Sequence, residues 1–178
     1  MERWEIGGFK RLKIGGVGKP YHTSAGFRNK LSKCKDMTNK IIDSLNGQLK
    51  ISDLLIVSKK TVPNDLFRCF KPNDIEVRDV KTGYIHYTIR DINLKNYYFY
   101  FSLCFFGDKL ARLTFGFKDQ PGMLSWDDWS EAKEIQRKVE YDHWLNDEIG
   151  TLRTFPWGTI VTFFDGKGGG SGIVLRYN

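Results

Sequence analysis

NYYFYFSLCFFGDKLARLTFGFK, residues 96–118, is the stretch that decides the fold. Aromatic and aliphatic side chains fill both of its halves, which is typical of β-strands that pack on a core. Between the halves stands Gly107-Asp108, a pair suited to a two-residue turn that requires positive φ. We therefore predict two antiparallel strands, residues 96–106 and 109–118, joined by this turn.

Side chains alternate between the two faces of a strand, so the face of each residue can be predicted. In the second strand Arg112 and Thr114 belong to one face, and the buried face is predicted to hold Ala111, Leu113, Phe115 and Phe117. The first strand is aromatic on both faces, its two sets being Tyr97, Phe99, Phe101, Leu103, Phe105 and Tyr98, Tyr100, Ser102, Cys104, Phe106. We expect such a strand to lie centrally, with other elements covering each face.

Further strand patterns flank this pair. Residues 75–80 alternate between apolar and charged side chains, Lys81-Thr82-Gly83 predicts a turn, and β-branched and aromatic residues continue over 84–92. A closing hairpin is predicted from residues 155–164 and 172–177. Weaker strand patterns cover residues 1–15 and 49–57, with a glycine-rich loop over 15–24. The result is a mostly antiparallel sheet, a meander plus a C-terminal hairpin.

Two amphipathic helices are predicted from apolar residues that recur every three or four positions. The early helix covers residues 25–45 and ends at Asn46-Gly47. The late helix covers residues 126–149, after the capping residue Ser125. We expect its carboxylates to be exposed, with Glu134 and Lys138 as a surface pair. Its inward stripe is predicted to be Trp129, Ala132, Ile135, Val139 and Leu145, with Trp144 beside Leu145.

These elements predict a single α+β domain that spans residues 1–178. A chain of 178 residues, 40% of them hydrophobic, can bury one core of the required size. The three cysteines are odd in number and lack the close spacing of a zinc or redox motif, which favours a reducing compartment.

Charge and hydropathy set expectations for location and partners. Residues 1–50 carry a net charge of +7, residues 51–118 of +4, and residues 119–178 of −4. The basic part has two interpretations, an attraction for an anionic partner such as nucleic acid, or a solvated lysine-rich surface. The charged start Met1-Glu2-Arg3-Trp4-Glu5 does not match a signal peptide. The most apolar stretch, 97–106, is shorter than the ~20 residues of a membrane-spanning helix. We therefore expect a cytoplasmic protein without membrane contact.

No motif predicts catalysis, a cofactor or a metal. Gly15-Gly16-Val17-Gly18-Lys19 fails as a phosphate-binding loop, because Lys13 stands where its first glycine is required and Pro20 where its Ser or Thr is required. The loop 165–171, with Lys167 as its cation, is either an anion-binding nest or a flexible hairpin tip. The histidines lack the spacing of metal ligands; they are His22, His86 and His143.

The last third of the chain combines a capped helix ending in Trp144-Leu145, then Phe155-Pro156-Trp157-Gly158, then the strand 159–164 and the terminal Ile173-Val174-Leu175-Arg176-Tyr177. In these features Trp126–Tyr177 resembles a pattern of small bacterial proteins, several of which are immunity proteins of toxin–immunity pairs.

The resemblance implies a stoichiometric inhibitor that docks on a toxin domain and covers its active site or substrate path, and not an enzyme. The candidate partner-binding residues are Glu131, Glu134, Asp142, Arg153 and Lys167. Two alternatives stay open. One is a basic accessory protein that binds nucleic acid, and the other is an enzyme that uses the loop 166–171 for a phosphorylated substrate. The oligomeric state is not predicted.

Overall fold

The computed structural model describes residues 40–122 and 129–178. The chain divides into two compact units, Met1–Asp36 and Met37–Asn178, and every described residue belongs to the second. The predicted strand over 1–15, the loop over 15–24 and most of the early helix lie outside the described residues.

The described unit has an α+β fold, as predicted. Its elements in chain order are β1 (Leu49–Lys50), β2 (Ile56–Val57), α2 (Pro63–Cys69), a 3₁₀ turn (Pro72–Asp74), β3 (Ile75–Asp79), β4 (Tyr84–Leu94), β5 (Tyr97–Phe106), β6 (Lys109–Lys118), α3 (Glu131–Ile149), β7 (Thr154–Phe155), β8 (Gly158–Asp165) and β9 (Gly170–Tyr177).

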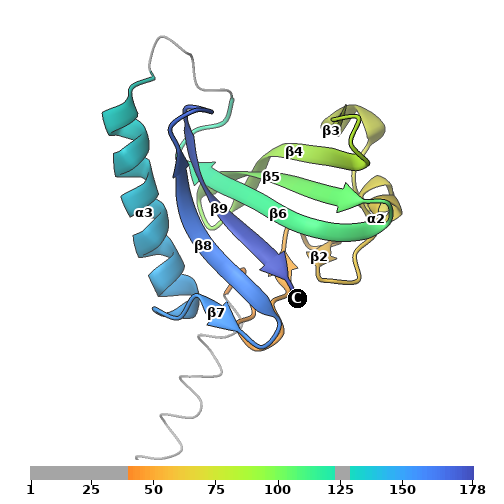
Figure 1. Cartoon of the computed structure of the whole chain (residues 1–178), viewed down its shortest axis with the longest axis horizontal. Coiled ribbons are helices and arrows are strands. Elements are labelled where there is room, and N and C mark those ends of the chain that lie inside the picture. Colours follow the sequence, from red (N-terminus) through yellow and green to blue (C-terminus); the bar gives the residue numbers. More distant parts are fainter. Residues whose placement is uncertain (1–39, 123–128) are drawn as a thin grey trace, which may run out of the picture. The chain divides into compact units, whose positions relative to one another are not determined.

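Seven strands form one antiparallel sheet in the order β3-β4-β5-β6-β9-β8-β7. Strands β3 to β6 are the predicted meander, and Gly107 has the positive φ of 56° that its turn requires. Strands β8 and β9 are the predicted closing hairpin. The hairpin joins the meander because β9 pairs with β6 around Thr114 and Val174. Figure 1 shows β9 lying between β6 and β8.

Strand β5 lies inside the sheet, as its aromatic residues predict, and four of its side chains are fully buried: Phe99, Phe101, Leu103 and Phe105. The register of β5 with β6 shifts after Cys104, which faces Arg112, so that the next residue of β5 faces Leu110. Ala111 is therefore the extra residue of a β-bulge and is exposed. Its predicted place on the buried face is wrong, and Leu110 occupies that place.

One face of the sheet is covered, and the other is largely open among the described residues. Helix α3 packs on the covered face, where Trp144 contacts three phenylalanine rings of β5 and β6. Leu66 of α2 and Leu49 and Val57 of the small β1–β2 sheet complete this core. In Figure 1, α3 runs beside β8, while α2 and β2 lie toward the meander. On the other face of β5, Phe106 at the end of the strand is 54% exposed, whereas Cys104 is only 3% exposed.

Helix α3 begins after Ser130, whose side chain accepts a hydrogen bond from the Lys133 N–H, and it ends at Gly150. Its buried residues are Glu134, Tyr141, Leu145 and Glu148. The predicted inward stripe is confirmed at Trp144 and Leu145, and it is wrong at the other four members, which are exposed: Trp129, Ala132, Ile135 and Val139. The predicted start at residue 126 is also too early, since residues 129 and 130 are not helical.

Buried carboxylates explain which side of α3 faces the sheet. Glu148 accepts hydrogen bonds from the main-chain N–H groups of Ile41 at 2.8 Å and Ile42 at 3.4 Å, and it also pairs with Lys95. A buried carboxylate with these partners is satisfied, so its burial does not carry the penalty of an unpaired charge. The prediction that the carboxylates of this helix are all exposed is therefore wrong.

The chain before β2 differs from the prediction. Residues 40–45 are not helical, and Ile42 instead forms an isolated β-bridge with Leu49. Gly47 adopts a φ of 72° in a tight turn, and a Cβ there would lie 2.4 Å from the ring of Trp157. Residues 49–57 form two short paired strands and not one continuous strand.

Candidate functional site

A row of polar side chains crosses the open face of the sheet. Strand register places Arg78 of β3 opposite His86 of β4, His86 opposite Cys104 of β5, and Cys104 opposite Arg112 of β6. The pairing of β6 with β9, continued by one position, places Arg112 opposite Arg176. Residues opposite one another on neighbouring strands share a face of the sheet. We name these five residues the arginine row.

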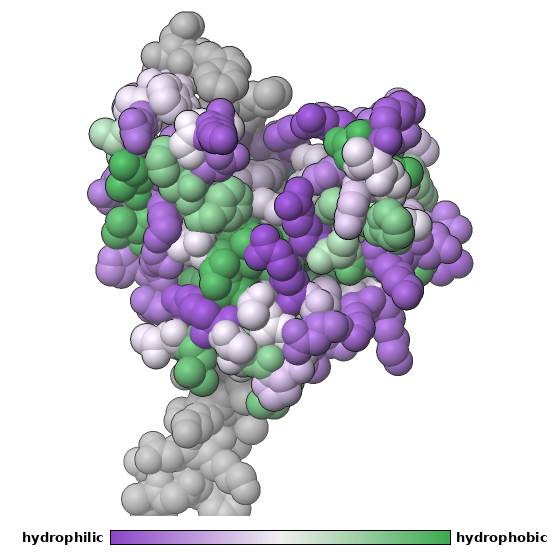
Figure 2. Space-filling view, viewed as in Figure 1, coloured by the Kyte–Doolittle hydropathy of each residue, from purple (hydrophilic) through white to green (hydrophobic). Residues whose placement is uncertain are grey.

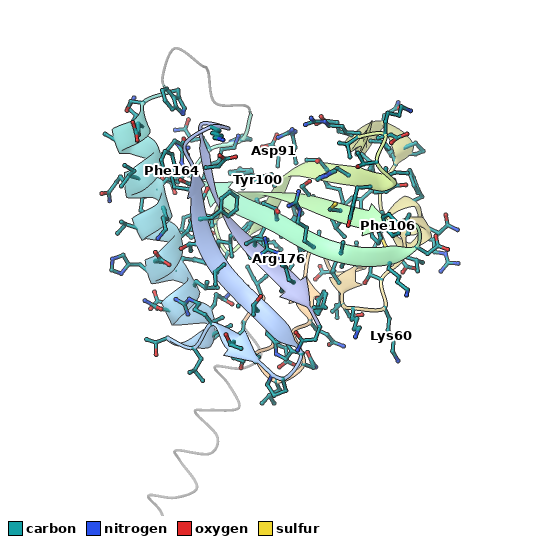
Figure 3. The ribbon with its side chains drawn as sticks, in the orientation of Figure 1. Lys60, Asp91, Tyr100, Phe106, Phe164 and Arg176 are labelled. Atoms are coloured by element: carbon teal, nitrogen blue, oxygen red, sulfur yellow. The ribbon has the colours of Figure 1, made fainter. Side chains whose placement is uncertain are left out.

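All five residues of the arginine row line a groove of about 550 Å³. The other lining residues are Val80, Tyr84 and Ala111. Figure 3 labels Arg176 near the middle of the molecule and Phe106 to its right, near the end of β5. In the same view, Figure 2 shows hydrophobic atoms in the middle of the molecule with hydrophilic atoms beside them. The groove thus combines exposed charge with a partly apolar lining.

The positive charge of the row is not neutralised within the described part of the chain. Its three arginines are exposed, and none forms an ion pair with a carboxylate of residues 40–122 or 129–178. Three other cations of the meander are paired: Arg90 with Glu76 at 2.9 Å, Lys118 with Asp91 at 3.6 Å, and Lys81 with Asp79 at 2.8 Å. The groove is therefore a place where an external anion gains favourable contacts.

The two titratable groups at the middle of the row are held in their neutral forms. Burial, followed by the positive charges of Arg112 and Arg78, lowers the pKa of His86. Burial raises the pKa of the Cys104 thiol, although Arg112 acts in the opposite direction. A nucleophilic cysteine requires a thiolate, commonly beside an imidazolium. These pKa shifts oppose that state at Cys104 and His86.

Two exposed aromatic rings adjoin the groove. The ring centroids of Tyr84 and Phe106 lie 5.0 Å apart at an interplanar angle of 51°. Phe106 also covers Gly83, whose Cβ, if present, would lie 2.7 Å from the ring. Part of each ring therefore packs against other residues of this chain, and the rest is exposed to solvent. Tyr84 is 41% exposed and Phe106 is 54% exposed.

A second polar cluster is buried where β6 and β9 diverge. The Tyr100 hydroxyl donates to the main-chain oxygen of Ser171 at 3.2 Å, and the Tyr141 hydroxyl donates to a main-chain oxygen of β6 at 3.2 Å. The ring of Tyr100 lies over Gly116, where a Cβ would approach it to 2.8 Å. Burial raises the pKa of Tyr100 to about 12 and also raises that of Tyr141. With its polar atoms bonded internally, this cluster joins β9 to the meander and does not form an open site.

Two of the predicted partner-binding residues lie near the ends of α3, and a third lies in the β8–β9 turn. Glu131 in its first turn and Lys167 in the β8–β9 turn are exposed. Arg153 donates to the main-chain oxygens of Gly150 at 2.6 Å and Leu152 at 3.0 Å, so it holds the chain that leaves α3. None of the three lines the groove.

The other two predicted residues, Glu134 and Asp142, have partners within this chain. Glu134 is 5% exposed, accepts a hydrogen bond from the Ser171 N–H at 2.9 Å, and pairs with Arg137. Asp142 accepts hydrogen bonds from Lys138 at 2.8 Å and from a threonine hydroxyl of β8. The predicted Glu134–Lys138 pair is therefore wrong, because each residue has a different partner. Neither residue lines the groove.

The sequence did not identify the arginine row. Alternation correctly placed Arg112 on the face opposite the core, but it could not show that Arg176 lies on the neighbouring strand. That pairing joins segments about sixty residues apart in the chain, and local pattern carries no information about it. The available signal was one outward-facing arginine in each of three predicted strands.

The loop 165–171 and the histidines were the other candidate sites of the sequence. Asp165 accepts hydrogen bonds from the main-chain N–H groups of Lys167 at 3.0 Å and Gly169 at 2.8 Å, in a tight hairpin tip. His143 is exposed, and His22 lies outside the described residues. Within residues 40–122 and 129–178, no three side chains of the metal-binding types cluster as metal ligands would, and no helix is long and apolar enough to cross a membrane.

No protein-family model, curated protein or solved structure matches this chain.

Proposed function

We propose that this chain is an immunity-type binding protein, which inhibits a toxin by covering an acidic part of its surface with the groove. The observation that carries the proposal is the arginine row, in which Arg78, Arg112 and Arg176 share one exposed face without a carboxylate partner among the described residues. Arginine suits this task, because its planar guanidinium binds carboxylates through paired hydrogen bonds and is weakly hydrated.

The resemblance of Trp126–Tyr177 to immunity proteins supports a protein as the partner. The arginine row adds the polarity of the contact, since a basic groove recognises an acidic surface. The neutral states of His86 and Cys104 favour stable binding over turnover. The proposed place of action is the cytoplasm, as a stoichiometric complex with the toxin domain.

Co-expression with the protein encoded by the neighbouring gene tests this function. The expected result is rescue of growth from a toxic neighbour, together with co-purification of the two proteins. A variant with Arg78→Gln, Arg112→Gln and Arg176→Gln should lose both. Arg68→Gln, which removes one guanidinium from α2 outside the groove, should keep both. A harmless neighbour that does not co-purify would reject the proposal.

Nucleic-acid binding is the second candidate, and one observation favours it. Tyr84 and Phe106 present exposed ring surface beside the arginines, as stacking surfaces for bases do. This function predicts binding to single-stranded DNA or RNA that weakens steeply as salt increases. A mobility-shift assay at low ionic strength that detects no complex with either polymer would reject it.

A further inference from the structure

Arg112 and Arg176 differ from the rest of the arginine row because they lie on adjacent strands. Neighbouring strands are about 4.8 Å apart. The pairing of β6 with β9 ends at Leu113 opposite Leu175, and Arg112 and Arg176 are the next residue on each strand. Like charges in this position destabilise a sheet. An anion held between the two guanidinium groups would offset this repulsion.

The surroundings of this pair favour a small oxyanion that sheds its water. The pair shares its groove with Val80, Ala111 and Cys104, whose side chains carry no formal charge. Hydrogen bonds from arginine to an oxyanion strengthen where water is excluded, and two guanidinium groups can together donate to both oxygens of one carboxylate.

The extent of the positive region distinguishes a protein carboxylate from a nucleic-acid backbone. A nucleic acid is bound along a track of cations that follows successive phosphates. Here Arg90, Lys81 and Lys118 are already paired with carboxylates of this chain. Among the residues that line the groove, the uncompensated cations are Arg78, Arg112 and Arg176, and this short row fits a compact acidic patch.

We infer that Arg112 and Arg176 form a binding site for one carboxylate side chain of a partner protein, held between their guanidinium groups. Arg78 lies three strands from Arg112, about 14 Å away at the usual strand spacing, and receives a second carboxylate of the same acidic patch. The inference rests on the proposed function and identifies the contact by which the partner is recognised.

The test uses the full chain and two probes, a peptide of eight glutamates and octathymidylate, with affinity measured at low ionic strength. The glutamate peptide should bind more tightly. Arg112→Gln and Arg176→Gln should each weaken its binding at least about tenfold, the loss expected for one charged hydrogen-bonding partner. The double variant should lose little more than either single variant, because the two guanidinium groups act on one carboxylate. Arg68→Gln should bind as the unchanged protein does.

Three results would overturn the inference. Octathymidylate could bind more tightly than the glutamate peptide, or Arg68→Gln could reduce the affinity for the peptide as much as the groove variants do. The third is a double variant whose loss of affinity equals the sum of the two single losses in free energy. Thermal unfolding of each variant separates these results from misfolding, since the glutamine variants should unfold at the same or a higher temperature. The outcome is independent of the toxin experiment. Binding of the peptide without rescue rejects the proposed function alone, whereas rescue that survives Arg112→Gln and Arg176→Gln rejects this site alone.

Discussion

The two faces of the seven-stranded sheet are built from alternate residues of the same strands, yet their side chains differ in burial and charge. On the covered face, Phe101, Leu103 and Phe115 are fully buried beneath other elements. On the open face, Cys104 follows Leu103 in the chain and Arg112 precedes the buried Leu113, and both Cys104 and Arg112 belong to the arginine row. The covered face therefore sets the register of the strands, and the open face receives its arrangement of charges from that register.

Charged residues on the two faces differ in whether they have a partner of opposite charge. Glu134 and Glu148 are buried, and both have main-chain N–H donors and a cationic partner. Arg112 and Arg176 are exposed and have no such carboxylate among the described residues. The protein thus neutralises these two buried carboxylates and leaves a row of exposed arginines on the open face of the sheet.

The largest expected effect comes from the covered face. Phe101→Ala removes a fully buried ring from the centre of the core and should lower the free energy of unfolding by about 3–5 kcal/mol. Urea unfolding measures the change. The exposed Phe106→Ala on the opposite face of the same strand is the matched control and should cost far less. Equal losses would contradict the distinction between the two faces.

A smaller loss should follow from removing a buried carboxylate. Glu134→Ala leaves the Ser171 N–H and Arg137 without this partner and should lower the free energy of unfolding by about 2–3 kcal/mol. Glu131→Ala, on the same helix but exposed, should change it by less than about 0.5 kcal/mol. Chemical denaturation of both variants tests whether the carboxylates of α3 divide in this way.

Alkaline pH should weaken the junction between the meander and the hairpin. Burial raises the pKa of Tyr100 to about 12, whereas a tyrosine in the unfolded chain ionises near pH 10. The contribution of the neutral Tyr100 hydroxyl to the free energy of unfolding is therefore complete below about pH 10. It is lost as the pH rises toward about 12, by an amount on the order of 2 kcal/mol. Unfolding measured across this range should show a shallower decline for Tyr100→Phe. An unchanged decline would show that other groups cause it.

The smallest expected effect has the opposite sign. Arg176→Gln removes one of two like charges on adjacent strands and should raise the free energy of unfolding by about 0.2–1 kcal/mol in the free protein. Differential scanning calorimetry at low salt is the measurement, and the gain should shrink as salt screens the repulsion. A loss of stability would show that Arg176 has a stabilising partner and that the open face is not repulsive.

The strands were predictable where the pattern was local. The pairs β3–β4, β5–β6 and β8–β9 are hairpins, and each turn is marked by glycine. The inward side of α3 was not predictable, because Glu134 and Glu148 take inward positions only in the presence of donors from distant segments. Hydrophobic periodicity assigned Ile135 and Val139 to the core instead.

The candidate site was less predictable than the fold. Four of its five residues come from the meander, where the register follows from hairpins, but the fifth, Arg176, requires the pairing of β6 with β9. The bulge at Ala111 makes the prediction of the site harder, because it interrupts the alternation of β6 side chains between the two faces of the sheet. None of the predicted partner-binding residues lines the groove, since most of them were chosen from a helix that faces the opposite side of the sheet.

The position of β9 also constrains how the sheet can assemble. Because β9 separates β6 from β8, the meander can be complete while its β6 edge still has unpaired N–H and C=O groups. During synthesis that edge stays exposed until residues 170–177 have been made, and it offers a template for pairing with another chain. A nascent chain stalled before this point should therefore be especially prone to aggregation, and its protection depends on the eight residues that close the gap.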